Sequence, residues 1–312
     1  MINFLTKVLL KRELVLYNKH RQTIPIVNNH NNRKKYIFLQ SNKILSKIPV
    51  KSKYKLKYRI AYILLNILDP KYVIDINWIS RMSALYYVWS KKSKNSKFIV
   101  VQHGSYIGGN VTDIAHRYTN CDVFLVWGNY FKVLFENYNK GKKISVVDFG
   151  NPIYNKFKRE KFYYKNKTIN KILLAPSGIK DQPLEQLYKL HDKLIELGFV
   201  VKLKEHSMQT KFYTEIKKIS KESEDSEKLL KNQNYDIIIS DHSSIILDAI
   251  FFKNPVICFS SVETKFTSYM DNAFYKLKDL KNKEDLLNLL NIKTQEVLFS
   301  DMITLNPDKN EL

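Results

Sequence analysis

A histidine set between a glutamine and a glycine offers the clearest chemistry in this chain. Gln102-His103-Gly104 directly follows the apolar run 98–101. A histidine at the end of a buried strand can accept a proton from a hydroxyl near neutral pH, and a glycine beside it leaves room for a substrate. The alternative is a loop histidine that only hydrogen-bonds to the backbone. We predict that His103 acts as a general base.

Two lysines and a histidine alternate along the segment 202–206. Every second side chain of a strand points the same way, so Lys202, Lys204 and His206 share one face. Their positive charge could neutralise a departing phosphate, and His206 could donate a hydrogen bond to it. The alternative is an edge strand whose lysines face solvent. We predict that Lys204 binds donor phosphate and that His206 is a second catalytic candidate.

A polar turn, Asp241-His242-Ser243-Ser244, separates the apolar segment 235–240 from a predicted helix that begins at Ile245. Asp241 suits the N-cap, and serines with free N–H groups at a helix start could hold an anion. Asp248 lies one turn beyond Ser244 on the same face and could contact the same ligand or a ribose hydroxyl. Simple capping is the alternative, and it accounts for Asp241 and one serine.

Glycine is scarce in this chain, with eight residues, and most of its positions follow predicted strands. Glycine permits tight turns and close approach of the backbone to a ligand, and ligands of open α/β sheets bind at the carboxyl ends of strands. The glycines therefore mark one edge of the predicted sheets. We expect the following residues to line a cleft at that edge: Gly104, Trp127, Gly128, Gly150 and Asn151.

Short β-branched or aromatic runs alternate with segments of helical period, which predicts βα units with parallel sheets. The expected strands are 36–40, 72–76, 97–102, 122–127, 144–149, 171–175, 199–204, 235–240 and 255–259. Residues 1–17 mix apolar and charged residues and are predicted to form an amphipathic helix rather than a signal peptide. The domain prediction is an N-terminal domain over 1–157, a linker over 158–170, a C-terminal domain over 171–300 and a tail over 301–312.

The composition is globular and strongly basic, with 44% hydrophobic residues and a net charge of +22 over 312 residues. Such a charge favours anionic partners, although a solvated lysine surface explains it equally well. Cys121 and Cys258 lack the spacing of a zinc site or a disulfide framework, which fits a reducing cytosol. No apolar run approaches the ~20 residues of a membrane span.

Several common chemistries lack their sequence signatures in this chain. There is no GxGxxG or GxxxxGK[ST] motif for phosphate loops, and no GxSxG for a hydrolase nucleophile. No Asp-x-Asp pair, HExxH or Cys/His cluster is present to hold a metal. We therefore expect no metal and no cofactor, with lysines taking over the electrostatic role of a metal.

The order of these motifs resembles that of GT-B enzymes of bacterial surface polysaccharide assembly. It is most similar to the capsule glycosyltransferases and the CDP-glycerol glycerophosphotransferases of teichoic-acid type. The resemblance extends from Lys97 to Phe259 and rests on short motifs: Gln102-His103-Gly104, Val126-Trp127-Gly128, Phe149-Gly150-Asn151-Pro152, Lys204-Glu205-His206, Ser240-Asp241-His242-Ser243-Ser244, Asp248 and Pro255.

The resemblance implies an α/β fold of GT-B type, with two Rossmann-like parallel-sheet domains that face each other across a cleft. It assigns the catalytic base to His103 and donor-phosphate contacts to Lys204 and His206. It also assigns donor contacts to Asp241, Ser243 and Ser244. Ser207 stands where those families usually have proline, which makes the loop after His206 less rigid.

We therefore expect a metal-independent enzyme that moves a sugar from a nucleotide-activated donor to a glycan or lipid-linked acceptor such as capsule, O-antigen or a teichoic-acid-like polymer. It is expected in the cytoplasm, peripherally bound to the anionic inner face of the plasma membrane through its N-terminal helix and lysines. Nucleic acid is not expected as a partner. The alternatives are CDP-glycerol or polyol-phosphate transfer, a UDP-sugar 2-epimerase, and a basic scaffold without catalysis.

Overall fold

The computed structural model describes most of the chain as two compact units. The described residues are 13–30, 36–40, 54–77, 80–104, 119–154, 169–176, 184–205, 219–240, 243, 245–259, 274–275, 281–288 and 303–305. The first unit holds the described residues up to His103, those of 119–154 and those of 303–305, and the second holds Gly104 and those of 169–288. The contact division falls after Lys158, among residues expected as a linker, which lie outside the described ones.

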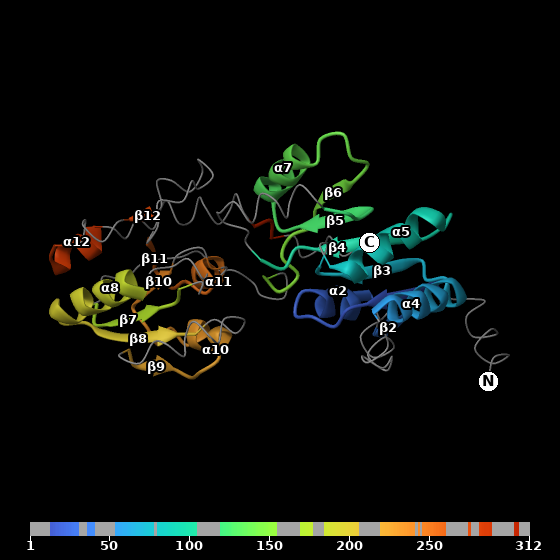
Figure 1. Ribbon diagram of the computed structural model, residues 1–312. Coiled ribbons are helices and arrows are strands. Elements are labelled where there is room, and N and C mark those ends of the chain that lie inside the picture. Colours follow the sequence, from blue (N-terminus) through green and yellow to red (C-terminus); the bar gives the residue numbers. More distant parts are fainter. Residues whose placement is uncertain are drawn as a thin grey trace. The chain divides into compact units, whose positions relative to one another are not determined.

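The first unit is built on a six-stranded parallel sheet with the order β2-β1-β3-β4-β5-β6. The strands are β1 (Glu13–Tyr17), β2 (Tyr36–Gln40), β3 (Tyr72–Asp75), β4 (Lys97–Val101), β5 (Val123–Val126) and β6 (Ser145–Asp148) (Figure 1). Strand β2 lies on one side of β1, and the later strands β3 to β6 follow on its other side. The strand order therefore reverses between β1 and β3. In open α/β sheets the carboxyl ends of the strands at such a reversal bind ligands.

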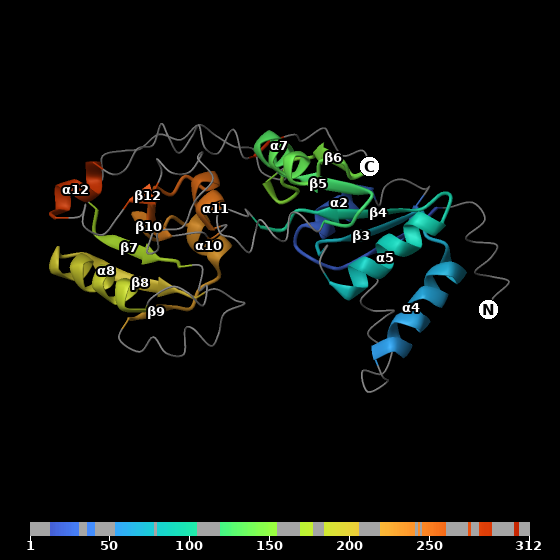
Figure 2. The ribbon, with the colours of Figure 1, turned by 45° about the horizontal axis from the view of Figure 1, so that its top comes forward.

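The helices of the first unit pack beside these strands. They are α2 (Thr23–His30), α4 (Tyr54–Leu68), α5 (Arg81–Lys92) and α7 (Asn129–Tyr138). Helix α5 lies against β4 and beside α4, and α7 packs against β5 and β6 (Figure 2). Among the described residues, no helix is long and apolar enough to cross a membrane.

The helix expected over residues 1–17 is wrong for its last five residues. Glu13–Tyr17 form the strand β1, which pairs with both β2 and β3, and Leu14, Val15 and Leu16 are at most 4% exposed. A strand covered on both faces is apolar throughout and shows no alternation, so its short run resembles a piece of helix. Residues 1–12 lie outside the described residues.

The second unit repeats the design with the strand order β12-β11-β10-β7-β8-β9, again parallel throughout. Its strands are β7 (Lys171–Leu174), β8 (Val200–Lys204), β9 (Lys221–Glu222), β10 (Ile237–Ser240), β11 (Val256–Phe259) and β12 (Phe274–Tyr275). Its helices are α8 (Leu184–Glu196), α10 (Ser226–Lys231), α11 (Ile245–Phe251) and α12 (Lys283–Asn288). Here the order reverses between β7 and β10.

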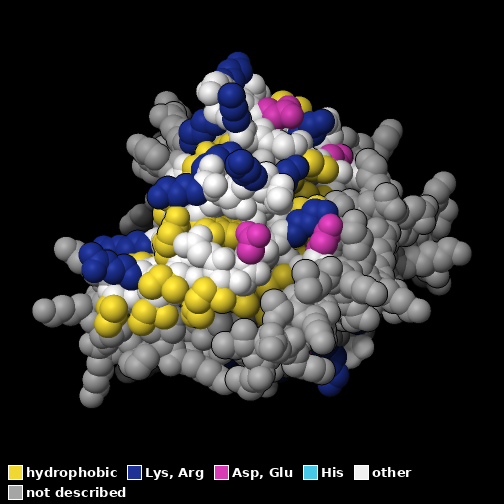
Figure 3. Space-filling view, turned by 90° about the vertical axis from the view of Figure 1, so that its right-hand side faces the viewer, with side chains coloured by type: hydrophobic (Ala, Val, Ile, Leu, Met, Phe, Trp, Pro, Cys, Tyr) yellow, Lys and Arg dark blue, Asp and Glu magenta, His cyan; other side chains and the backbone are white. Residues whose placement is uncertain are grey.

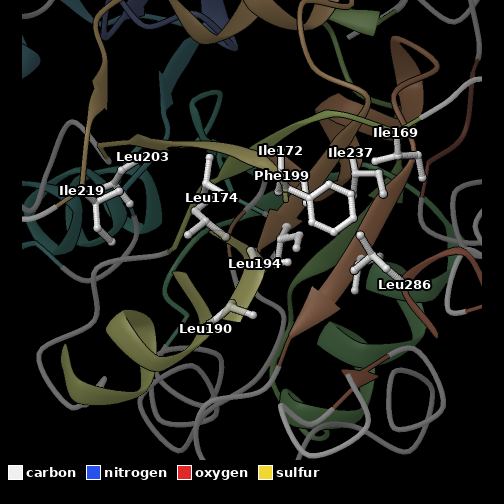
Figure 4. Close-up of a cluster of buried hydrophobic side chains, with 13 residues drawn as sticks. Ile169, Ile172, Leu174, Leu190, Leu194, Phe199, Leu203, Ile219, Ile237 and Leu286 are labelled. Atoms are coloured by element: carbon white, nitrogen blue, oxygen red, sulfur yellow. The ribbon is translucent and has the colours of Figure 1, made fainter. Parts of the chain in front are cut away.

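The core of the second unit shows why these segments form these elements. Leu190 and Leu194, one turn apart on α8, pack against Ile172 and Leu174 of β7 and against Phe199 (Figure 4). Helix α8 ends before Gly198, whose φ of +83° lies in the left-handed region that glycine adopts without strain.

Each of the nine strands expected from the sequence corresponds to an observed strand, with ends that differ by at most two residues. The two-residue strands β9 and β12 were not expected. The presence of two parallel α/β sheets confirms the predicted fold class.

The end of the chain does not behave as a tail where it is described. Ile303 is 2% exposed. The Thr304 backbone N–H donates to the Trp127 carbonyl at 2.7 Å, and its hydroxyl donates to Asp148 Oδ2 at 2.8 Å. Residues 303–305 therefore belong to the first unit and cover part of the edge at β5 and β6.

Candidate functional site

The carboxyl edge of the first sheet gathers polar side chains from three neighbouring strands. Asn18 and His20 follow β1, Asp75 ends β3, and His103 follows β4. These positions lie beside the point where the strand order reverses. The edge therefore has the location that open α/β sheets use for ligands.

His103 has a defined tautomer. Its Nδ1 lies 2.9 Å from the Ile76 carbonyl oxygen, and because a carbonyl can only accept, Nδ1 carries the proton. The lone pair then resides on Nε2, the atom that would take a substrate proton. Burial lowers the pKa of His103, the Ile76 hydrogen bond opposes this, and the charge of Arg21 lowers the pKa further. The lowered pKa favours the neutral ring, which is the form that can accept a proton.

His20 stands next to His103 with the opposite tautomer. The two rings meet edge to face with centroids 6.4 Å apart. The Gln22 backbone N–H donates to His20 Nδ1 at 3.3 Å, which places the His20 proton on Nε2. Burial lowers the pKa of His20 to about 4, with further contributions from His103 and Arg21. The pair thus combines one ring nitrogen able to accept and one able to donate, both uncharged at neutral pH.

Asp75 holds the turn that orients His103. It is 6% exposed, and its Oδ1 accepts from Asn18 Nδ2 at 3.0 Å, from the Ile76 N–H at 2.7 Å and from the Asn77 N–H at 3.3 Å. Burial raises the pKa of Asp75, while these hydrogen bonds act to lower it. Since Ile76 supplies the carbonyl bound by His103, Asp75 positions the ring without touching it.

Gln102 and Trp127 connect the carboxyl ends of β4 and β5. The Trp127 backbone N–H donates to Gln102 Oε1 at 2.9 Å, and the Trp127 indole donates to the Gln102 carbonyl at 3.0 Å. Gln102 is fully buried and Trp127 is 2% exposed. Gln102, which directly precedes His103, is therefore held in place, and the Trp127 ring is part of the buried core beneath this edge.

The glycine turns beside this pair are part of the same edge. Gly128 precedes α7 in extended conformation, and Gly150 has a φ of +85° that requires glycine. Asn151 is 1% exposed, and its side-chain oxygen accepts from the Ile153 N–H at 3.0 Å. Gly104 directly follows His103. These predicted residues lie at the carboxyl edge of the first sheet, with the Trp127 and Asn151 side chains buried beneath its surface.

The predicted donor residues belong to the second unit. The Lys204 ammonium donates to the Glu224 carbonyl at 2.5 Å, and Lys202 lies 3.6 Å from Glu222. Ser243 is 8% exposed, and its hydroxyl accepts from the Ile245 N–H at 3.4 Å. In this structure the Ser243 hydroxyl therefore contacts the first residue of α11.

Other donor residues can be placed only in part. Asp248 lies in the first turn of α11. Ser240 Oγ donates to the Ala175 carbonyl at 2.7 Å, which ties the ends of β10 and β7 together where the strand order reverses. His206, Asp241 and Ser244 lie outside the described residues.

Sequence reasoning missed Asn18, His20 and Asp75. The signal for the first two was present, because a polar Asn-Lys-His-Arg stretch directly follows the apolar run 14–17. Assigning that run to a helix hid the fact that this stretch follows a strand. Asp75 was counted as part of a strand, although a carboxylate at the end of a buried strand points to a role there.

Solved structures with the GT-B fold share the two doubly wound parallel sheets of this chain. The wall teichoic acid polymerase TagF with CDPG superposes with a TM-score of 0.55 at 14% identity, over 96% of this chain and 85% of that one. Staphylococcus aureus MnaA with UDP gives 0.57 at 13% identity, over 96% and 94%. UDP-N-acetylglucosamine 2-epimerase from Rickettsia bellii gives 0.54 at 14% identity, over 96% and 89%. No protein-family model matches the chain, and no curated protein matches it in sequence.

Proposed function

We propose that this chain is a GT-B glycosyltransferase that moves a sugar from a nucleotide-activated donor to a bacterial surface polysaccharide, with His103 as the general base. The observation that carries the proposal is the His103 ring, fixed by Ile76 with its lone pair on Nε2, at the strand-order reversal of the first sheet. A base at this place can activate an acceptor hydroxyl. The shared fold with nucleotide-dependent enzymes supports the assignment.

In the proposed reaction His103 Nε2 takes the proton of the acceptor hydroxyl. The acceptor oxygen bonds to the anomeric carbon of the sugar, and the bond from that carbon to the donor phosphate oxygen breaks. The electron pair of that bond leaves with the nucleotide. His20 Nε2–H is a positioning donor for the acceptor, and the glycine turns at Gly104, Gly128 and Gly150 let the acceptor approach the edge.

The second unit is proposed to stabilise the leaving phosphate. Lys204 would exchange its Glu224 carbonyl contact for a phosphate oxygen, and His206 would donate a hydrogen bond to the same group. Asp241, Ser243 and Ser244 would hold the donor, and Asp248 would bind its ribose. No metal and no cofactor other than the donor is part of this mechanism. Turnover that EDTA abolishes and Mg²⁺ restores would contradict that part of the proposal.

The test is a single substitution with a matched control. His103→Ala should abolish nucleotide release from a donor and acceptor mixture, while the donor still raises the melting temperature as it does for the wild type. His191→Ala, a partly buried histidine on α8 in the second unit, should leave both readouts unchanged. Full turnover by His103→Ala would overturn the assignment of the base.

A second candidate is the transfer of glycerol phosphate or another polyol phosphate from a CDP-linked donor. The shared fold with TagF, whose structure contains CDPG, favours it. A thermal-shift screen of CDP-, UDP- and GDP-linked donors, followed by detection of the released nucleotide, separates the two: CMP release from CDP-glycerol supports phosphate transfer. Turnover of a UDP-sugar without any acceptor would support a 2-epimerase instead, as the Rickettsia bellii structure suggests.

We further propose that the acceptor is lipid-linked and that the protein works in the cytoplasm, bound peripherally to the inner face of the plasma membrane. The net charge of +22 supports an anionic surface as partner. The route expected through a helix over 1–17 does not hold for Glu13–Tyr17, which are buried in the sheet. The proposed contact therefore does not involve Glu13–Tyr17.

A further inference from the structure

Helix α4 is apolar on two opposite faces. Ala61 and Leu65 are buried at 0% and 2% exposure and attach the helix to the first unit. On the opposite side, Leu56, Ile63 and Ile67 are 50%, 55% and 72% exposed. At 100° per residue these three side chains fall within about 40° of one another, so they form one stripe along three turns.

This stripe is not the usual scatter of surface apolar residues. Val88, 50% exposed, lies on the neighbouring helix α5, so four exposed large apolar side chains gather on two adjacent helices. By comparison, Ile195 on α8 is 46% exposed but stands between the charged residues Asp192, Lys193 and Glu196. Figure 3 shows hydrophobic side chains gathered on this face of the described residues, with Lys and Arg beside them and a few Asp or Glu side chains among them.

The charges around the stripe all have one sign within the two helices. Helix α4 contains Lys55, Lys57 and Arg59, α5 contains Arg81, Lys91 and Lys92, and neither helix contains Asp or Glu. Of these basic residues, Lys91 forms an ion pair with Asp122, which directly precedes β5. The sequence from Leu14 to Leu68 likewise holds no acidic residue, and Asp69 follows directly after the helix. The Lys92 ammonium lies 5.6 Å from the centre of the Tyr62 ring, which joins the basic end of α5 to α4.

We propose that the face formed by α4 and α5 docks on an anionic lipid surface, with Leu56, Ile63, Ile67 and Val88 entering the headgroup region. An amphipathic helix of this kind lies in the plane of the interface, with its apolar side chains buried and its basic residues at the phosphates. A second copy of this face is a poor occupant, because it would bring like charges together. Nucleic acid is also a poor occupant, because the centre of the face is aliphatic rather than aromatic.

The inference deepens the membrane contact proposed above and assigns it to particular residues. It places the contact on the same unit as His103, so a lipid-linked acceptor and the proposed base would meet on one rigid sheet. Docking on lipid does not depend on which donor the enzyme uses.

The experiment measures binding of the full chain to vesicles by flotation. Wild-type protein should bind vesicles of phosphatidylglycerol in phosphatidylcholine and should not bind phosphatidylcholine alone. Ile63→Asn/Ile67→Asn should weaken binding by about tenfold or more, because the variant lacks the free energy gained when the two apolar side chains move from water into the lipid. Lys57→Gln/Arg59→Gln should weaken it about twenty-fivefold, at about fivefold for each basic residue.

Matched controls change similar residues elsewhere. Ile195→Asn removes an apolar side chain of similar exposure from the second unit, and Lys140→Gln/Lys143→Gln removes two exposed charges from the turn after α7. Both should bind as the wild type does. Melting temperatures close to that of the wild type would show that all variants fold, as expected for exposed positions.

Three results would overturn the proposal: no binding of the wild type to anionic vesicles, equal binding by the α4 variants and the wild type, or a wild-type dimer that the α4 variants dissociate. Turnover with a water-soluble acceptor separates this question from the proposed function. The α4 variants should keep that turnover. If the wild type transferred no sugar to the water-soluble acceptor, the proposed function would be refuted, and the result of the vesicle experiment would still stand.

Discussion

Replacing His20 by asparagine should make the first unit less sensitive to acid. In the wild type, burial and the neighbouring His103 and Arg21 lower the pKa of His20 from 6.5 to about 4. The unfolded chain therefore binds a proton at this residue from about pH 6.5 downward, whereas the folded chain resists it until about pH 4. The stability that the neutral ring allows is complete above pH 6.5 and is lost as the pH falls toward 4.

The size of this effect follows from the pKa. A fall from 6.5 to about 4 corresponds to about 3 kcal/mol of free energy. Because the ring is only half-buried, solvent screening reduces the contribution to roughly 1.5 kcal/mol. Asparagine does not titrate, and its side-chain oxygen can accept from the Gln22 N–H in place of His20 Nδ1. The variant should therefore lose about 1.5 kcal/mol less than the wild type between pH 7.5 and pH 4.

Urea unfolding followed by tryptophan fluorescence measures this difference. Trp78, Trp89 and Trp127 all precede residue 158 and so report on the first unit. Comparing the two proteins at each pH cancels other groups, including Asp75, whose raised pKa acts in the opposite direction by stabilising the fold at low pH. Parallel curves for the wild type and His20→Asn would refute the burial and pairing of His20 described above. His191→Asn, in the second unit, should leave the fluorescence curve unchanged.

Three further predictions concern the same edge. Arg21→Gln should raise the pKa of His103, because the arginine charge lowers it, and the acid limb of the profile of kcat/KM against pH should move to higher pH. Lys19→Gln is the control at a neighbouring position, and an acid limb that Arg21→Gln leaves unmoved would count against His103 as the base. Trp127→Phe removes the indole donor from the buried Gln102 carbonyl and should cost about 1–3 kcal/mol in urea unfolding; a wild-type midpoint would show that this bond is dispensable. Thr304→Val should destabilise the first unit by about 1 kcal/mol through loss of the Asp148 contact, in the same assay, and no change would mean that residues 303–305 are not held there.

The sequence predicted the fold better than it predicted the surroundings of the base. Runs such as 98–101 and 237–239 are apolar throughout and β-branched, so local preference and burial agree and the strands were found within one or two residues. The run 14–17 has the same character, but charged residues before it suggested a helix, and only its pairing with β2 and β3 decides the matter. Pairing between distant segments cannot be read from a local pattern.

The same limit explains which functional residues were missed. His103 could be predicted as a functional residue from the glycine beside it. His20 could be recognised only once β1 and β4 are placed two strands apart in one sheet. The hydrogen bonds of Asp75 to Asn18 and to the turn at Ile76 likewise depend on that strand order. Lys204 shows the reverse case, because alternation predicted its face correctly but not the Glu224 carbonyl that holds its ammonium.

The contact between Thr304 and Asp148 has a consequence for how the protein is made. These residues are 156 positions apart, and the part of the second unit from Arg159 to Ser300 is synthesised between them. A ribosome would release the strands of the first sheet long before the residues that cover the Trp127 carbonyl and Asp148 leave the exit tunnel. Those groups stay solvated until residues 303–305 have been synthesised, and the first unit reaches its final stability only after that. A fragment cut at the domain boundary would resemble this nascent state permanently.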